Sequence, residues 1–218
     1  MLKSSGAMAA AVVFSRVLGF VREAVYAAFM GDGLVAAAFK LAFLIPNLFR
    51  RLLGEGALSA AFIPIFKAKE KTAGENEMWK AANAVISGLT VAASALIALV
   101  VLGISLVFAG DLFLQQHDRS GILNDQTWLM LQLLRIMFPY LLLVCLAAIF
   151  IGMLNARGYF FIPAMGTSLL NLVMISSVFL SIFLGRSQME QIFGVAIGVL
   201  LGGTAQAIYQ WFHLKKEG

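Results

Sequence analysis

The chain has 218 residues, of which 61% are hydrophobic and 12% are charged, and its mean hydropathy is +0.91. Soluble domains are nearer half apolar and a quarter charged, so this composition excludes a soluble globular protein and predicts a polytopic membrane protein. In a membrane protein, the net charge of +5 is best interpreted from how lysine and arginine are distributed among the segments that flank the spans. We expect no nucleic-acid partner.

Six segments are long and apolar enough to suggest spans, because a bilayer needs roughly 20 apolar residues per helix. In chain order they cover residues 7–30, 34–53, 81–109, 128–153, 161–184 and 192–213. Residues 1–218 are predicted to form a single transmembrane domain, an all-α bundle of six helices. Lys3 and the apolar residues after it resemble a signal peptide, but the apolar run continues, so we expect an uncleaved first span.

Residues 54–80 separate the second and third spans and are predicted to begin as an amphipathic interfacial stretch and end as a charged loop. Pro46, Pro139 and Pro163 fall inside predicted spans, where proline removes a helix hydrogen bond and permits bending. The last span carries glycines at four-residue spacing, a close-packing face for another helix; they are Gly194, Gly198 and Gly202. The simpler interpretation is that this face packs against another helix of the same bundle. The alternative is that it binds a second lobe or a second copy of the chain.

Lysine and arginine are distributed unequally between the two sides of the predicted membrane. One side, which holds both termini, has ten of them: Lys3, Arg50, Arg51, Lys67, Lys69, Lys71, Lys80, Arg157, Lys215 and Lys216. The opposite side has only Arg119 and Arg186. Because cytoplasmic loops carry the excess of positive residues, both termini are predicted to be cytoplasmic in a bacterial inner membrane.

Four cations fall inside predicted spans: Arg16, Arg22, Lys40 and Arg135. A charge at the bilayer centre costs roughly 2.5 kcal/mol or more, so we expect these side chains to face a shared polar interior. Arg135 is the exception, because it lies close to the outer end of its span, where anchoring explains it better.

The first span concentrates this charge. Arg16 and Glu23 are seven positions apart and share a helix face, and Arg22 lies about 120° away from Arg16. Ser15 and Gly19 lie beside them and leave room for another group. The alternative is that Arg16 and Arg22 only form ion pairs with Glu23 or a neighbouring carboxylate.

The second span adds more polar groups: Lys40, Asn47, Arg50 and Arg51, with Glu55 just beyond. Arg50 and Arg51 could also extend to lipid phosphates at the membrane surface. The cations outnumber Glu23 and Glu55, so a cavity built from both spans would be positive. Arginine favours phosphate, and the apolar surroundings suggest an anion attached to lipid. A lipid phosphate or pyrophosphate meets both requirements.

Other chemistries find little support in the sequence. There is no phosphate-binding G-x-x-x-x-G-K-[ST] loop, which argues against ATP hydrolysis. Cys145 is the single cysteine and is expected to be a packing residue, while His117 and His213 are isolated. We therefore expect no metal and no cofactor in this chain. A lipid-pyrophosphate phosphatase would need a histidine or carboxylate cluster near the arginines, so catalysis is not expected.

Three stretches resemble the MurJ (MviN) family of lipid II flippases in the multidrug/oligosaccharidyl-lipid/polysaccharide exporter superfamily. They are "FSRVLGFVREA" at 14–24, "IPNLFRRLLGEGALSAAFIPIF" at 45–66, and "FPYLLLVCLAAIFIGMLNARGYFFIPA" at 138–164 with "LLN" after it. The resemblance implies alternating-access transport of an undecaprenyl-pyrophosphate-linked peptidoglycan precursor. By position, the family's cavity arginines correspond to Arg16, Arg22 and Arg50, and its acidic residue to Glu55.

The chain departs from the family pattern at two points. The family usually has an aspartate where this chain has Ala37 in "VAAAFK", with Lys40 close by, which changes the charge balance. Family members have about fourteen spans, so the resemblance implies the N-terminal lobe alone. A C-terminal lobe or a second copy would be its partner, and any ion or membrane-potential coupling site would lie elsewhere. Alternatives are transport of another lipid-linked oligosaccharide, or a non-transporting half that only assembles with a partner.

Overall fold

The computed structural model describes residues 2–49, 58–116, 123–185 and 187–216, and within these ranges the chain forms α-helices and no strands. There are eight described helices: α1 Leu2–Met30, α2 Leu34–Phe49, α3 Leu58–Ala73, α4 Glu75–Gln116, α5 Asp125–Met137, α6 Tyr140–Ala156, α7 Phe161–Leu184 and α8 Gln188–Leu214. The all-α prediction is therefore confirmed for the described residues.

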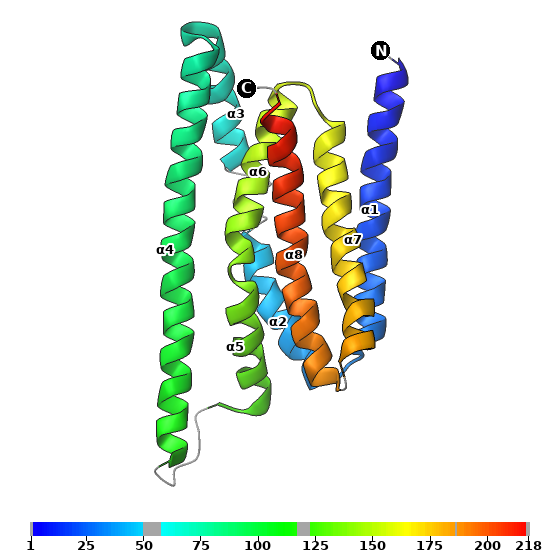
Figure 1. The fold of residues 1–218 in the computed structure, drawn as a ribbon, viewed down its shortest axis with the longest axis vertical. Helices are drawn as coiled ribbons and strands as arrows, with labels where there is room; N and C mark the ends of the chain where they lie inside the picture. Colours follow the sequence, from blue (N-terminus) through cyan, green and yellow to red (C-terminus); the bar gives the residue numbers. More distant parts are fainter. Residues whose placement is uncertain (1, 50–57, 117–122, 186, 217–218) are drawn as a thin grey trace.

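The helices run roughly along one axis, and both ends of the chain lie at the same end of the bundle, drawn at the top in Figure 1 and called the upper end below. The turn between α3 and α4 is also at the upper end, where Gly74 has a φ of +85° that favours glycine. The turn between α1 and α2 lies at the lower end, with Gly31 at a φ of +63°.

Three helices are long and apolar enough to cross a membrane by themselves, namely α4, α7 and α8. The pair α5 and α6 forms a fourth candidate, bent by 43° at the break that contains Pro139. The described residues thus give three or four candidate spans, and the exact number of six is not established. In α1, Arg16, Arg22 and Glu23 fall within eight residues and reduce its apolar character.

The structure differs from the prediction between the second and third spans. Residues 58–73 form α3 and residue 75 already begins α4, so from residue 58 on almost all of the predicted amphipathic stretch and charged loop is helical. The lysines and Glu70 of this segment are good helix formers, which explains the difference. Both α2 and α3 pack along the bent pair, α2 mainly on α5, and α3 on α6 as well as α4.

A mostly continuous apolar core holds α2, α5, α6, α7 and α8 together, and a second cluster joins α3, α4 and α6 near the upper end. Among the described helices α7 and α8 share the most extensive contact, and Gly194 and Gly198 leave room there for serine side chains of α7. The glycine face of the last span is therefore used inside the bundle, as the simpler interpretation predicted.

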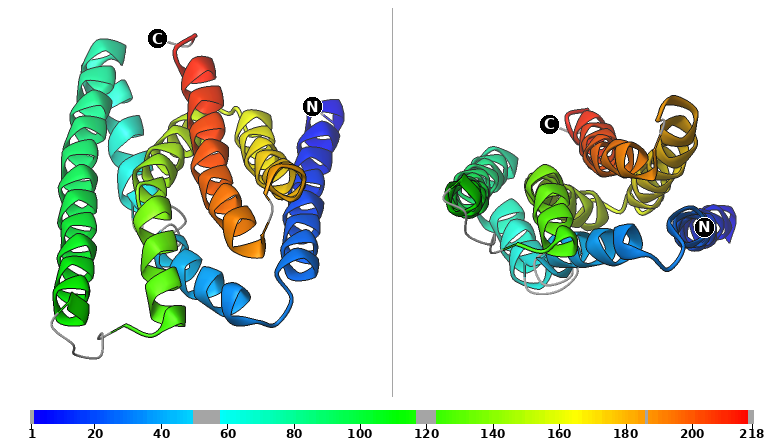
Figure 2. Two further views of the ribbon diagram at one scale, coloured as in Figure 1. Left: turned by 60° about the horizontal axis from the view of Figure 1, so that its bottom comes forward. Right: turned by 90° about the horizontal axis from the view of Figure 1, so that it is seen from below.

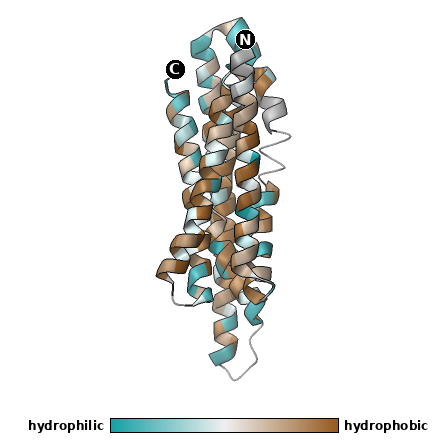
Figure 3. Cartoon of the chain, turned by 90° about the vertical axis from the view of Figure 1, so that its right-hand side faces the viewer, coloured by the Kyte–Doolittle hydropathy of each residue, from teal (hydrophilic) through white to brown (hydrophobic). Residues whose placement is uncertain are grey.

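The helices α1 and α4 lie at opposite edges of the molecule (Figures 1 and 2), and α1 packs mainly on α7 with few contacts to α2. Hydrophobic residues dominate the middle of the bundle and hydrophilic residues gather towards its ends (Figure 3). The functional candidates of α1 are therefore positioned by α7 more than by any other described helix.

Candidate functional site

The polar residues of α1 meet α7 at Asn171. This side chain is buried, and its amide oxygen accepts a hydrogen bond of 3.0 Å from Arg22 Nη1. Its amide nitrogen donates a longer bond of 3.4 Å to the backbone oxygen of Ser15. Gly19 faces the same amide, since a Cβ at this position would lie 3.6 Å from Asn171 Nδ2. Asn171 therefore joins α7 to two turns of α1.

Arg22 is largely enclosed, with 18% of its side chain exposed, and it also forms an ion pair with Glu23, which is mostly exposed. Its Nη1 lies 3.9 Å from the sulfur of Met174, and its buried Nε has no hydrogen-bond partner among the described residues. Glu23 pairs with the adjacent Arg22, as the ion-pair alternative predicted for that arginine, whereas Arg16 has no such pair among the described residues.

Arg16 is in a different situation. It lies at the middle of α1, is exposed, and forms no hydrogen bond or ion pair with a described residue. It lines an open pocket of about 370 Å³ between α1, the end of α6 and the start of α7. The other lining residues are Met8, Val12, Ser15, Ile151, Asn155, Phe160, Pro163, Ala164 and Thr167.

The pocket combines one unpaired cation with neutral polar groups and apolar walls. Ser15, Asn155 and Thr167 provide hydroxyl and amide groups near the arginine. A guanidinium presents several donors in a planar fork that matches phosphate or carboxylate, and apolar walls accept the hydrocarbon part of the same ligand. Such an arrangement is suited to an amphiphilic anion, and the residues that line the pocket include no histidine or carboxylate.

The candidates of the second predicted span are not all described. Lys40 is exposed on α2 and Asn47 is half-buried near its end, but no α2 residue lines the Arg16 pocket. Arg50, Arg51 and Glu55 lie outside the described residues. The structure therefore brings Ser15, Arg16, Arg22 and Glu23 into one region with α7, and it does not place Lys40 in the pocket they adjoin.

Other predicted residues occupy ordinary positions. Cys145 is buried in the core, and His213 packs on Tyr209, whose backbone oxygen lies 2.8 Å from its Nδ1. Arg135 is exposed in the last turn of α5, and His117 lies outside the described residues. Within the described ranges no group of three or more potential metal ligands comes together.

Sequence reasoning missed the residues contributed by α6 and α7, namely Asn155, Thr167 and Asn171. A neutral polar residue in an apolar span carries a weaker signal than a charge, because it costs far less to bury. The one available signal was the position of Asn171 within the "LLN" stretch that follows the third family-like segment.

Known proteins resemble the chain along nearly its whole length. The family model described as "Lipid II flippase MurJ" matches residues 26–218. A probable lipid II flippase MurJ of Treponema pallidum (strain Nichols) is 36% identical and covers 100% of this chain and 40% of the relative. One from Bdellovibrio bacteriovorus is 38% identical, covering 99% and 40%, respectively.

A solved structure titled "Lipid II flippase MurJ, inward closed conformation" superposes with a TM-score of 0.69 at 29% identity. The match covers 93% of this chain and 41% of that chain. The chain thus spans about 40% of the length of the curated relatives it matches.

Proposed function

The chain belongs to the lipid II flippase MurJ family, and from that premise we propose that it supplies the N-terminal lobe of a lipid II flippase. Its cargo would be an undecaprenyl-pyrophosphate-linked peptidoglycan precursor that moves from the inner to the outer leaflet. The chain is a multi-pass protein of the inner membrane. Flipping is transport and requires no catalytic group in this lobe.

The observation that carries this proposal is the unpaired guanidinium of Arg16 in an open pocket at mid-helix. A cation in the middle of a span is costly unless it meets a polar partner, and a diphosphate provides one. Arg22, positioned by Asn171 below the pocket, adds a second guanidinium, while Ser15 and Asn155 offer neutral hydrogen-bonding groups. Asn47, Arg50 and Glu55 stay predicted ligand-binding residues of the complete cavity, and Lys40 and Arg51 stay predicted modulators of its charge. No described residue of α2 lines the Arg16 pocket itself.

We propose that the chain crosses the membrane six times. The second crossing, however, is not formed by the predicted segment 34–53 alone. Since α2 and α3 pack one after the other along the bent α5–α6 pair, they would form one interrupted crossing. The described lysines of α3, the two lysines that follow α8 (Lys215 and Lys216) and Arg157 lie towards the upper end. The positive-inside rule then makes that end cytoplasmic.

A partner lobe completes the proposed transporter. The match to only about 40% of each relative supports a C-terminal lobe as that partner. Alternating access would then arise from movement of the two lobes around the anion. The coupling of this movement to an ion or to membrane potential would depend on residues outside this lobe.

A rescue experiment tests the proposal. The chain, fused to the C-terminal part of a matched relative, is expressed in cells depleted of their own flippase. We expect growth to be restored by the unchanged chain and lost with Arg16→Ala, at equal membrane abundance. Arg135→Ala is the matched control, because it removes an exposed arginine outside the pocket. Full rescue by Arg16→Ala and by Arg22→Ala would remove the proposal.

The alternative cargo, another lipid-linked oligosaccharide, shares the diphosphate and the lipid. Competition between lipid II and a teichoic-acid or O-antigen precursor for the purified protein distinguishes the two. If neither lipid binds, the chain would instead be a non-transporting half that only assembles with a partner.

A further inference from the structure

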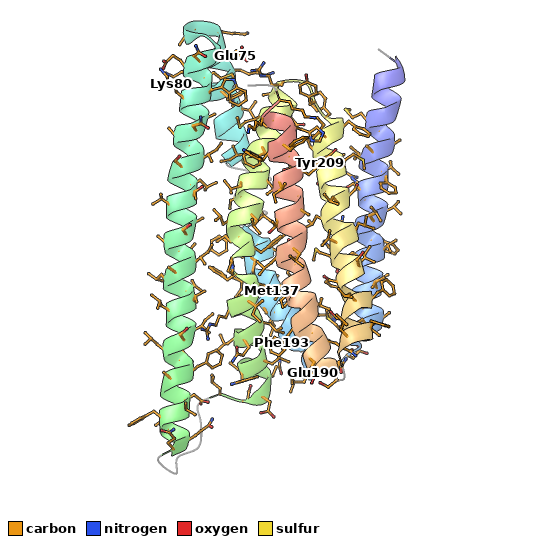
Figure 4. All side chains as sticks on the ribbon, in the orientation of Figure 1. Glu75, Lys80, Met137, Glu190, Phe193 and Tyr209 are labelled. Atoms are coloured by element: carbon orange, nitrogen blue, oxygen red, sulfur yellow. The ribbon has the colours of Figure 1, made fainter. Side chains whose placement is uncertain are left out.

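A second pocket lies between the upper parts of α4, α6 and α8, away from α1. Its volume is about 300 Å³, and it is lined by Trp79, Asn83, Ile86, Thr90, Leu146, Phe150, Met153, Trp211, Leu214 and Lys215. None of these residues lines the Arg16 pocket. We call it the α4/α6/α8 groove. In Figure 4, Glu75 and Lys80 mark the upper end of α4 and Tyr209 the upper part of α8, beside this groove.

The polarity of the groove changes with depth. The α4 side consists of Trp79, Asn83, Ile86 and Thr90, spaced so that they share one helix face. From Trp79 to Thr90 the helix descends about 16 Å, which is roughly half the thickness of the hydrocarbon core. The α6 wall consists of Leu146, Phe150 and Met153. Thr90, the deepest of the four, donates its hydroxyl to the backbone oxygen of Ile86 at 2.7 Å. With that hydroxyl satisfied, the deeper part of the groove is mainly apolar, while Asn83 and Lys215 make the upper part polar, as in a phospholipid.

The rim carries an unpaired positive charge. Lys215 Nζ lies 5.4 Å from the ring centroid of Trp211, and no described carboxylate pairs with it. The neighbouring Arg157 is instead paired with Glu75, and Lys80 donates to Glu77 at 2.8 Å. Of the cations around the groove, Lys215 is thus available to an anion from outside the protein.

The groove opens beside the most lipid-like helix of the chain. The apolar stretch of α4 is mostly exposed and carries no charge between Lys80 and Asp111. Two of the three tryptophans lie at the groove, and tryptophan is enriched where protein, lipid headgroups and water meet. Membrane lipid, and not solvent alone, is therefore the material that reaches this surface.

We propose that the α4/α6/α8 groove binds one anionic glycerophospholipid of the leaflet at the upper end. Its phosphate lies against Lys215, its headgroup reaches Asn83 and Trp79, and one acyl chain runs along Leu146 and Phe150. Basic pockets between membrane helices favour anionic headgroups in this way. The site is separate from the Arg16 pocket and does not depend on the proposed transport function.

Tryptophan fluorescence tests this proposal directly. The complete chain with Trp128→Phe, which leaves only Trp79 and Trp211, is reconstituted in phosphatidylcholine vesicles. A minor fraction of the lipid is brominated on its acyl chains, and is either phosphatidylglycerol or phosphatidylcholine. We expect brominated phosphatidylglycerol to quench the fluorescence more strongly at equal mole fraction. Equal quenching by the two lipids would overturn the proposal.

A pair of lysine variants separates the site from a general attraction of anionic lipid to this end of the protein. Lys215→Gln should lower the preference for phosphatidylglycerol about five-fold, the contribution of one lysine near an anionic lipid surface. Lys69→Gln on α3 removes an exposed lysine at the same end but outside the groove, and should leave the preference unchanged. Equal effects of the two substitutions would also contradict the proposal.

Discussion

At the level of single residues, Asn171 connects the two helices that carry the candidate site. It accepts a hydrogen bond from Arg22 and donates one to the backbone oxygen of Ser15, so it fixes the register of α1 along α7. A hydrogen bond to a charged group contributes more than one between neutral groups. The largely enclosed guanidinium of Arg22 depends on this hydrogen bond, since the carboxylate that pairs with it, Glu23, is exposed.

Asn171→Leu keeps the approximate volume and removes both hydrogen bonds. We expect the free energy of unfolding in detergent to fall by about 1–2 kcal/mol, because a charged donor loses its acceptor inside a membrane protein. Ser176→Leu, at an exposed position on the same helix, should change it little. If the two variants are equally stable, the role given to Asn171 is wrong.

The charged residues of the site could be predicted from the sequence, whereas most of its neutral polar residues could not. Arg16 and Arg22 stand out because an ion in a span needs an explanation, and Ser15 follows from its position beside them. The pairing of Arg22 with Asn171 was not predictable, because 149 positions separate the two residues and amides are tolerated in spans. The sequence also did not indicate that α2 contributes no residue to the α1–α7 pocket, so the place of Lys40 in the complete cavity stays a prediction.

At the level of helices, the contact between α7 and α8 depends on two glycines. A Cβ at Gly198 would lie 2.1 Å from Ser177 Oγ, and a Cβ at Gly194 would lie 2.3 Å from Ser181 Oγ. At Gly198 the Cβ of Ser177 would also lie 2.2 Å away, so a side chain fits there only if the helices move apart, whereas rotation of the Ser181 hydroxyl relieves part of the overlap at Gly194. The close packing of α7 on α8 in turn holds the helix that positions Arg22.

Gly198→Ala should therefore destabilise the protein by about 1–3 kcal/mol, the usual cost of overpacking. Ser177→Gly in the same chain removes the opposing side chain and should recover much of that loss. Gly103→Ala is the control, because nothing lies within 4 Å of the position a Cβ would take there. Thermal unfolding of the parent, Gly198→Ala, Gly198→Ala with Ser177→Gly, and Gly103→Ala measures the effect. If Gly198→Ala unfolds at the same temperature as the parent, this description of the packing is wrong.

Asp111 shows how the lower end of α4 is joined to the start of α5. Its buried carboxylate accepts from Gln115 Nε2 at 2.8 Å and from the backbone nitrogen of Leu123 at 3.0 Å. Asp111→Leu should lower the free energy of unfolding by about 1–3 kcal/mol, since the Leu123 N–H and the Gln115 amide lose a buried acceptor. Asp111→Asn keeps one oxygen and should lose less. Equal stability of both variants and the parent in denaturant titration would argue against this role.

Helix positions were predictable from apolar length, and so was the bend at Pro139, but helix ends were not. The run 128–153 was expected as one span, and the structure bends it by 43° where Pro139 separates α5 from α6. The second half of the 54–80 segment was expected as a charged loop, yet its lysines continue α3 until Gly74 reverses the chain. Charge indicates exposure to water and does not by itself indicate irregular structure.

At the level of the whole molecule, the two ends of the bundle differ in charge. The upper end carries Lys67, Lys69, Lys71, Lys80, Arg157, Lys215 and Lys216. The upper end also carries Glu70, Glu75 and Glu77, so its excess charge is positive, whereas near the lower end the described chain carries Asp32, Asp111, Asp125 and Glu190. This asymmetry supports the proposed orientation, with the upper end in the cytoplasm.

Cysteine labelling measures that orientation. In a Cys145→Ser background, a membrane-impermeant maleimide added to intact spheroplasts should label Glu190→Cys at the lower end. It should leave Lys216→Cys at the upper end unlabelled until the membrane is opened. Both positions are exposed in the structure, so access to water decides the result. The reverse pattern would invert the proposed topology.

The central claim is that the Arg16 pocket binds the anionic head of a lipid, and equilibrium binding to the purified chain tests it most directly. A polyprenyl diphosphate should bind, and the uncharged polyprenol should bind much more weakly. Arg16→Gln should weaken diphosphate binding about ten-fold or more, the usual effect of losing a charge-assisted hydrogen bond, while Arg135→Gln should not. An unchanged affinity in a folded Arg16→Gln protein would contradict the account.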